Sequence, residues 1–167
     1  MELVLYLIQL ALDFIDKRLA LKIAQTCLPY IDIIEAGTPL IKAEGIKIIK
    51  DLKKMGLPVA ADLKTFDAGR LEVELAAEYG ADYVTVLAAA SDITIEEFLS
   101  ACNKFDILAV ADLMNSPVRR AIYLEQIGMN YIAIHSGIDE QRKGLTPFPI
   151  LDQVRRTVKT PLVVAGG

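Results

Sequence analysis

The stretch VAADLKTFDAG, residues 59–69, decides the fold, because an apolar segment ends there in a cluster of charged residues. Six other apolar segments follow the same plan. Four end at an ionisable residue: Ile8–Leu12 at Asp13, Ile31–Ile34 at Glu35, Ile107–Ala111 at Asp112, and Tyr131–Ile134 at His135. The other two are Tyr83–Leu87, which ends at Ala88, and Leu162–Ala165, which ends at Gly166 and Gly167. Successive endings lie roughly 22 to 30 residues apart, the length of one strand–helix unit. This pattern is typical of a parallel β/α barrel whose functional residues gather at the carboxyl ends of the strands.

The segments between the strands have apolar residues at helical spacing. We expect helices over residues 17–27, 38–55, 68–79, 94–103, 116–127 and 149–158. Thr38, Thr94 (in a capping box with Glu97) and Ser116 are the expected amino-terminal caps. On the third helix, Leu71, Leu75 and Ala76 are expected to face the core.

A doubly wound open sheet would show the same alternation of strand and helix. The first strand, however, is not followed by a GxGxxG turn, and charged endings on several strands favour a closed ring over a single crevice. The expected fold class is therefore an α/β (β/α)8 TIM barrel, here truncated after strand 7 because the 167 residues hold seven strands. We expect one domain over residues 1–167 that lacks the last strand and its flanking helices.

Composition excludes several classes of protein. A net charge of −4 with dispersed basic residues argues against nucleic-acid binding. The apolar start, MELVLYLIQLALDF, is too short to span a bilayer and lacks the features of a signal peptide, so no membrane partner is expected. Cys27 and Cys102 lack metal-ligand spacing, which predicts a reduced, cytoplasmic protein. The hydrophobic fraction of 53% fits buried parallel strands together with a subunit interface.

Asp62 and Lys64 form the sharpest local signal for chemistry. On an extended strand they point to the same side, so that an acid and an amine together could bind a cation, polarise a carbonyl or exchange protons. A structural salt bridge at the end of the strand is the alternative. Glu35, on the neighbouring strand, would join Asp62 as a second hard oxygen ligand, a set that suits Mg²⁺.

His135 is the single histidine of the chain and stands at a strand end. We expect it to transfer a proton or bind substrate, and we expect a similar role for Asp112. Gly166 and Gly167 follow the seventh strand, where barrels often bind a phosphate through backbone N–H groups.

Several stretches resemble one known family. They are LALD at 10–13, IIEAGTPLI at 33–41, ADLKTFDAG at 61–69, GADYVTVL at 80–87, HSGID at 135–139 and VAGG at 164–167. In these motifs the chain is similar to the 3-hexulose-6-phosphate synthases of the orotidine 5′-monophosphate decarboxylase suprafamily, whose close relatives are the 3-keto-L-gulonate-6-phosphate decarboxylases.

The resemblance implies a reversible aldol reaction that is dependent on Mg²⁺ (or Mn²⁺). Formaldehyde adds to C1 of D-ribulose 5-phosphate through a 1,2-enediolate and gives D-arabino-3-hexulose 6-phosphate, the aldehyde-lyase step of the ribulose monophosphate pathway. A homodimer with shared active sites is also implied. The implied roles are metal binding by Glu35 and Asp62, stabilisation of the enediolate oxygen by Lys64, donation of Asp67 to the neighbouring subunit's site, proton handling by Asp112 and His135, positioning of substrate or Lys64 by Asp13, and phosphate binding by Gly166 and Gly167.

Two alternatives to the synthase remain open. The decarboxylases of the group tend to carry Glu at the position of Asp112 and a basic residue at the position of Ile138, so both positions favour the synthase. The other alternative is a non-catalytic, truncated barrel that binds at most a metal ion or a partner subunit.

Overall fold

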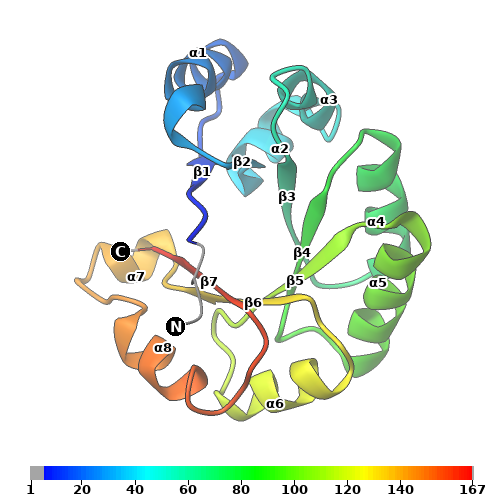
Figure 1. Cartoon of the computed structure of the whole chain (residues 1–167), viewed down its shortest axis with the longest axis vertical. Helices are drawn as coiled ribbons and strands as arrows, with labels where there is room; N and C mark the ends of the chain where they lie inside the picture. Colours follow the sequence, from blue (N-terminus) through cyan, green and yellow to red (C-terminus); the bar gives the residue numbers. More distant parts are fainter. Residues whose placement is uncertain (1–5, 167) are drawn as a thin grey trace. The chain divides into compact units, whose positions relative to one another are not determined.

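A computed structural model describes residues 6–166 as alternating strands and helices (Figure 1). The strands are β1 (Gln9–Leu12), β2 (Ile33–Ala36), β3 (Val59–Thr65), β4 (Tyr83–Leu87), β5 (Leu108–Asp112), β6 (Tyr131–His135) and β7 (Leu162–Ala165). The helices are α1 (Lys17–Cys27), the 3-10 helix η1 (Leu28–Tyr30), α2 (Thr38–Glu44), α3 (Ile48–Lys53), α4 (Gly69–Glu78), α5 (Asp92–Phe105), α6 (Arg119–Gln126), α7 (Ile138–Gln141) and α8 (Phe148–Val154).

The strands form one sheet in the order β1-β2-β3-β4-β5-β6-β7. Pairing is parallel: Ala11 lies opposite Glu35 on the first two strands, and Ala133 lies opposite Val163 on the last two. A doubly wound sheet reverses its strand order at a switch point, whereas here every strand neighbours the next one in the sequence. The expected β/α barrel fold, with the seven strands present here, is therefore confirmed, and the doubly wound alternative is wrong.

The chain divides into two compact units. The first comprises Met1–Leu63 and Glu74–Val84, and the second comprises Lys64–Val73 and Thr85–Gly167. Leu12, Ile34, Leu40, Ile49 and Leu52 are fully buried side chains of the first unit, and Ile95, Phe98, Leu124, Ile132 and Ile134 are their counterparts in the second. A single domain over residues 1–167 stays a prediction.

The second expected helix is two helices. Gly45 adopts a φ of +77° after α2, and the helical path resumes only with α3. Such a left-handed conformation ends a helix and suits glycine, which lacks a Cβ. Gly37 occupies the cap position of α2, so the expected capping role of Thr38 is wrong.

The expected inward face of the third helix is confirmed for Ala76, which is fully buried, and is wrong for Leu71 and Leu75. Leu71 and Leu75 of α4 are 56% and 39% exposed, whereas Val73 is fully buried in their place. Gly69, at the start of α4, approaches α5 so closely that an added Cβ would lie 2.5 Å from the carbonyl oxygen of Thr94. Positions 69, 73 and 76 share one face of a helix, so this close approach sets which side of α4 is buried.

The cap of α5 also differs from expectation. Helix α5 begins at Asp92, and its cap is Ser91, whose hydroxyl accepts from the Thr94 N–H at 3.1 Å. Glu97, the expected partner in a capping box with Thr94, instead contacts Arg70 at 2.6 Å.

The last two expected helices have different bounds in the structure. Helix α6 begins at Arg119 rather than at Ser116, and Val118 occupies its cap position. The expected helix over 149–158 is α8, Phe148–Val154, and the short helix α7, which the sequence did not predict, precedes it.

Both cysteines are free thiols, and burial raises the pKa of Cys102 to about 12. Over residues 6–166 there is no helix both long enough and apolar enough to cross a membrane.

Candidate active site

Buried polar side chains of the described residues lie within strands or directly after them. Asp62 lies in the middle of β3, Thr65 at the end of β3, Asp112 at the end of β5, and Ser136 directly after β6, and all are at most 5% exposed. Burying a polar or charged group is costly unless hydrogen bonds compensate it. Such residues are therefore the first candidates for a functional role.

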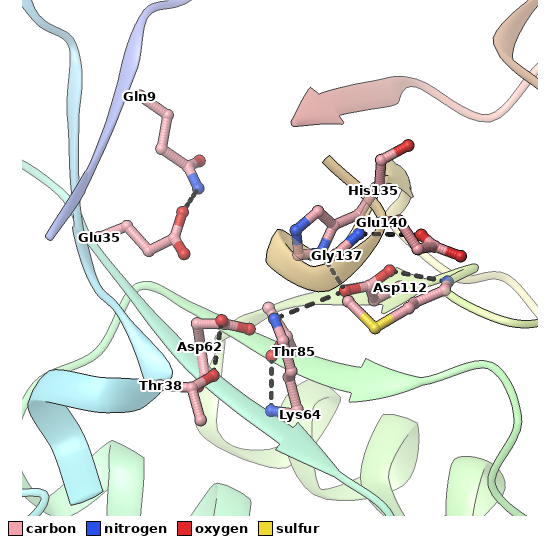
Figure 2. Close-up of polar contacts among 12 residues, drawn as sticks. Gln9, Glu35, Thr38, Asp62, Lys64, Thr85, Asp112, His135, Gly137 and Glu140 are labelled. Carbon is pink, nitrogen blue, oxygen red and sulfur yellow. Dashed lines mark hydrogen bonds and ion pairs between the residues drawn. The ribbon is translucent and has the colours of Figure 1, made fainter. Parts of the chain in front are cut away.

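In the first unit, Glu35 and Gln9 come together. Gln9 of β1 donates from Nε2 to Oε2 of Glu35 in β2 (Figure 2). Ala11 lies opposite Glu35 in the register, and Gln9 is two residues before Ala11. Because side chains alternate along a strand, Gln9 and Glu35 lie on the same face of the sheet.

Asp62 shares that face with Glu35. Glu35 lies opposite Ala60 of β3, and Asp62 is two residues further along that strand. The Asp62 carboxylate lies 2.7 Å from the hydroxyl oxygen of Thr38, which is also 2.8 Å from the Asp62 carbonyl oxygen. The hydroxyl that was expected to cap α2 instead contacts the buried acid (Figure 2).

Asp13 lies against the start of α2. A Cβ added to Gly37 would be 2.2 Å from Oδ1 of Asp13 and 2.7 Å from the carbonyl oxygen of Leu12. Only glycine leaves room for the Asp13 carboxylate at this point, which ties the end of β1 to the loop after β2.

The donor set of the first unit fits Mg²⁺. Glu35 and Asp62 present two carboxylates from neighbouring strands on one face of the sheet. Mg²⁺ typically takes one or two protein carboxylates and keeps waters or substrate oxygens as its other ligands. Residues 6–166 contain no cluster of three or more His, Cys, Asp or Glu side chains arranged for a metal ion, so any Mg²⁺ here would depend on this pair and on substrate.

In the second unit, Asp112 contacts both Lys64 and His135. Its Oδ2 lies 3.6 Å from Nζ of Lys64 and 3.0 Å from Nδ1 of His135 (Figure 2). The Asp112 side chain is 3% exposed, against 23% for Lys64 and 19% for His135. A buried carboxylate thus holds an ammonium group and an imidazole that both remain partly accessible.

The other oxygen of Asp112 fixes the orientation of the carboxylate. Oδ1 accepts from the Met114 N–H at 2.9 Å, so Oδ2 must face Lys64 and His135. If Nδ1 of His135 donates to Asp112, the imidazole is held as the tautomer whose Nε2 accepts a proton. This arrangement can stabilise a developing negative charge through Lys64 and move a proton through His135.

The conformation of Lys64 differs from the expected regular strand. Its φ is +48°, in the left-handed region, so the rule of alternating sides does not extend to it from Asp62. Its N–H donates to Oγ1 of Thr85, 2.9 Å away. The contact with Asp112 therefore depends on a local turn at the end of β3.

Asp67 lies in the loop between β3 and α4 and is exposed. Its Oδ1 accepts from the neighbouring Ala68 N–H at 2.7 Å, and Ala68 has a φ of +55°. Thr65 donates to Glu72 of α4 across this loop. These contacts order the loop and present Asp67 at the surface.

Gly166 follows β7 with a φ of +85°, and a Cβ there would lie 2.1 Å from the Ser136 carbonyl oxygen. Glycine is thus required by the close approach of two chain segments, whatever else the residue does. A phosphate-binding role for Gly166 stays a prediction, and Gly167 lies outside the described residues.

Three residues that the sequence did not identify as candidates contact the candidate side chains: Gln9, Thr38 and Thr85. Gln9 and Thr85 are polar residues inside apolar strand segments, which is the signal that could have identified them. Thr38 was interpreted as a helix cap because it precedes Pro39.

Comparison with known proteins gives one consistent result. The profile of the orotidine 5′-phosphate decarboxylase / HUMPS family matches residues 6–163. A 3-hexulose-6-phosphate synthase of Staphylococcus epidermidis is 38% identical over 169 residues, which cover 96% of this chain and 79% of the relative. One of Bacillus subtilis is 36% identical over 165 residues, with the same coverage of both chains.

Solved structures agree with the sequence relatives. The crystal structure of 3-hexulose-6-phosphate synthase from Salmonella typhimurium is 33% identical, with a TM-score of 0.93 over 97% of this chain and 79% of that one. A 3-keto-L-gulonate-6-phosphate decarboxylase from Vibrio cholerae is 29% identical, with a TM-score of 0.85 over 96% of this chain and 78% of that one.

Proposed function

Because the chain belongs to the orotidine 5′-phosphate decarboxylase / HUMPS family, we propose that it is an aldehyde-lyase with 3-hexulose-6-phosphate synthase activity. It joins formaldehyde to D-ribulose 5-phosphate in a reversible aldol reaction. The relatives of that name, at 36–38% identity over 96% of the chain, support the activity. The observation that carries the chemistry is the buried Asp112 between Lys64 and His135.

The reaction requires a carbanion equivalent at C1 of the pentulose phosphate. Removal of a proton from C1 gives a 1,2-enediolate, C1 then forms a bond to the formaldehyde carbon, and the resulting alkoxide takes up a proton. The ammonium group of Lys64 stabilises the negative oxygen of the enediolate, because a fixed positive charge favours the transition state that leads to it. His135 transfers the proton, and Asp112 holds both side chains in place.

Glu35 and Asp62 would hold a Mg²⁺ (or Mn²⁺) ion. When bound, the ion supplies Lewis-acid stabilisation of negative charge on substrate oxygens. The donor chemistry of these two carboxylates supports this assignment. Gln9 and Thr38 orient the two carboxylates through their contacts with Glu35 and Asp62.

The protein acts as a homodimer to which each subunit contributes Asp67 at its neighbour's active site. Asp67 is exposed in an ordered loop, next to the 60% exposed Phe66. Leu71 of α4 is also more than half exposed. Apolar side chains exposed beside an acid are what a subunit interface would cover.

The protein operates in the reducing cytoplasm. Its thiols, Cys27 and Cys102, are both free, and the second is buried. Small sugar phosphates and formaldehyde are its partners in the reaction, besides the second subunit.

The direct test is to mix the purified protein with ribulose 5-phosphate, formaldehyde and MgCl₂. We expect formaldehyde to be consumed only when the sugar phosphate is present, and Lys64→Ala to abolish this consumption. Lys143→Ala, at an exposed position before Gly144, is the matched control and should retain it. Release of CO₂ from 3-keto-L-gulonate 6-phosphate in place of formaldehyde consumption would identify a decarboxylase. If the protein catalyses neither reaction, the remaining alternative, a non-catalytic barrel, is supported.

Sharing of the active site has its own test. Lys64→Ala and Asp67→Ala are each expected to be inactive, but a mixed dimer has one site that carries neither substitution. After the two variants are unfolded and refolded together, about a quarter of the wild-type activity should return, because random pairing makes half of the dimers mixed. No recovery, with dimers present by sedimentation, would mean that Asp67 serves its own subunit.

A further inference from the structure

The backbone of Lys64 is held by the side chain of a neighbouring strand. Its N–H donates to Oγ1 of Thr85, which is the middle residue of β4. Both residues belong to the second unit, as do Asp112 and His135. Figure 2 shows the contact next to that between Lys64 and Asp112.

Lys64 adopts an unfavourable conformation. Its φ of +48° lies in the left-handed region, which residues with a Cβ rarely enter. Such a conformation persists only where the surroundings over-determine it, and it is frequent at functional sites. The hydrogen bond from Lys64 to Thr85 is an identifiable restraint of this kind.

We infer that Thr85 is a positioning residue for the proposed reaction: its hydroxyl fixes the left-handed turn at Lys64 and so directs the ammonium group to its place beside Asp112. The inference rests on the proposed function for its effect on catalysis. Thr85 acts through Lys64 and needs no contact with substrate.

The chemistry of the position is specific. A hydroxyl oxygen can accept a hydrogen bond from the Lys64 N–H, whereas the methyl group of valine, of similar shape, cannot. Thr85→Val would therefore leave a partly buried N–H without this acceptor and allow the backbone to relax. The segment after Lys64 keeps its own restraint, because Thr65 still contacts Glu72, so the variant is expected to fold.

The experiment compares Thr85→Val and Thr85→Ser with the wild-type protein. We expect Thr85→Val to lower kcat by about 10- to 100-fold, since a small displacement of a catalytic group has an effect of this size. KM for ribulose 5-phosphate should stay within about two-fold, because the interaction is realised in the transition state. Thr85→Ser, which keeps the hydroxyl, should restore most of the loss.

Hydrogen exchange of the Lys64 amide, followed by NMR on the ¹⁵N-labelled protein, gives a readout that does not require turnover. Thr85→Val should speed this exchange by about 10-fold or more, while Thr85→Ser should not. Thr157→Val is the matched control: Thr157 donates to the Gln153 carbonyl at 2.8 Å on the exposed surface, so its loss should leave kcat and the Lys64 amide unchanged.

The inference is overturned if Thr85→Val keeps the wild-type kcat, or if kcat falls while the Lys64 amide keeps its protection. Failure of Thr85→Ser to restore both would overturn it as well, because the methyl group rather than the hydroxyl would then matter. If the wild-type protein itself shows no synthesis, the proposed function fails, and the exchange data alone still decide whether Thr85 holds Lys64.

Discussion

Nδ1 of His135 lies 3.0 Å from Oδ2 of Asp112, the same oxygen that faces Nζ of Lys64 at 3.6 Å. One buried carboxylate oxygen thus contacts both of the groups that we propose to carry charge and proton. The other oxygen, Oδ1, accepts a hydrogen bond from the Met114 N–H, which fixes the orientation of the carboxylate.

Replacing Asp112 with asparagine should impair the reaction while preserving side-chain shape. The amide oxygen will stay with the Met114 N–H, which places the NH₂ group against Lys64 and His135, both of which are donors. We expect kcat to fall by about 100-fold or more, as when a histidine is held in the wrong tautomer. Steady-state kinetics with ribulose 5-phosphate and formaldehyde measure this.

Asp106→Asn is the control for that substitution. Asp106 is exposed at the end of α5 with a φ of +56°, a conformation that asparagine tolerates well. It should keep the wild-type kcat. Equal activity of Asp112→Asn and wild type would show that the contact between Asp112 and His135 has no part in the reaction.

Metal binding can be measured without turnover. Mg²⁺ at saturating concentration should raise Tm by a few degrees, because a ligand that binds only the folded state stabilises it. Glu35→Gln and Asp62→Asn should each abolish most of this rise, since each removes one of two charged ligands. Glu78→Gln, at an exposed acid of α4, should retain it. An unaltered rise in both site variants would place the ion elsewhere.

Gly37 and Gly137 form a natural pair for a stability measurement. Both cap a helix with nearly the same backbone, φ −63° and ψ 153° against φ −62° and ψ 157°. A Cβ at Gly37 would meet the Leu12 carbonyl oxygen at 2.7 Å, whereas one at Gly137 would make an ordinary contact with Met114 at 3.4 Å. Gly37→Ala should therefore lower the free energy of unfolding by about 1–3 kcal/mol more than Gly137→Ala. Urea denaturation of the two variants decides this, and equal losses would contradict the close approach of β1 to α2.

Asp51 should make the free energy of unfolding depend on pH in acidic solution. It lies 2.5 Å from Nζ of Lys17 and 2.6 Å from Nζ of Lys54, and the hydrogen bond with Lys17 is the main reason why its pKa falls to about 2. A carboxyl whose pKa is lower in the folded state stabilises the protein above its unfolded pKa of about 4. That stabilisation is lost as the pH falls toward about 2.

The difference between wild type and Asp51→Asn in free energy of unfolding should thus be present at pH 6 and vanish near pH 2. Because these side chains are partly exposed, we expect about 1 kcal/mol or less. Asp152→Asn, at an exposed acid that contacts Arg155, controls for the loss of one negative charge. A difference that grows as the pH falls would have the wrong sign and would reject the pairing.

Much of the candidate site could be predicted because strand ends are local features. Asp62 and Asp112 follow runs of small or β-branched residues, and an acid at such a point is visible in the sequence. The contact partners could not be predicted in the same way. The sequence around Thr38 predicts a helix cap, and only the fold shows that the Thr38 hydroxyl lies 2.7 Å from the Asp62 carboxylate.

The buried face of α4 and the turn at Lys64 illustrate the same limit. Leu71 and Leu75 have helical spacing but are exposed, whereas Val73 is buried, because the approach of Gly69 to α5 decides the rotation of the helix. The φ of Lys64 depends on a hydroxyl 21 residues away in the chain.

The sequence by itself determined the alternation of strand and helix and the charged residues at the strand ends, because periodicity and composition act over a few neighbouring residues. Only the tertiary structure decided which atoms meet: that Asp112 joins Lys64 to His135, and that Thr85 holds the Lys64 backbone. Such contacts arise when strands far apart in the chain are paired in register, and side chains then find their partners across them.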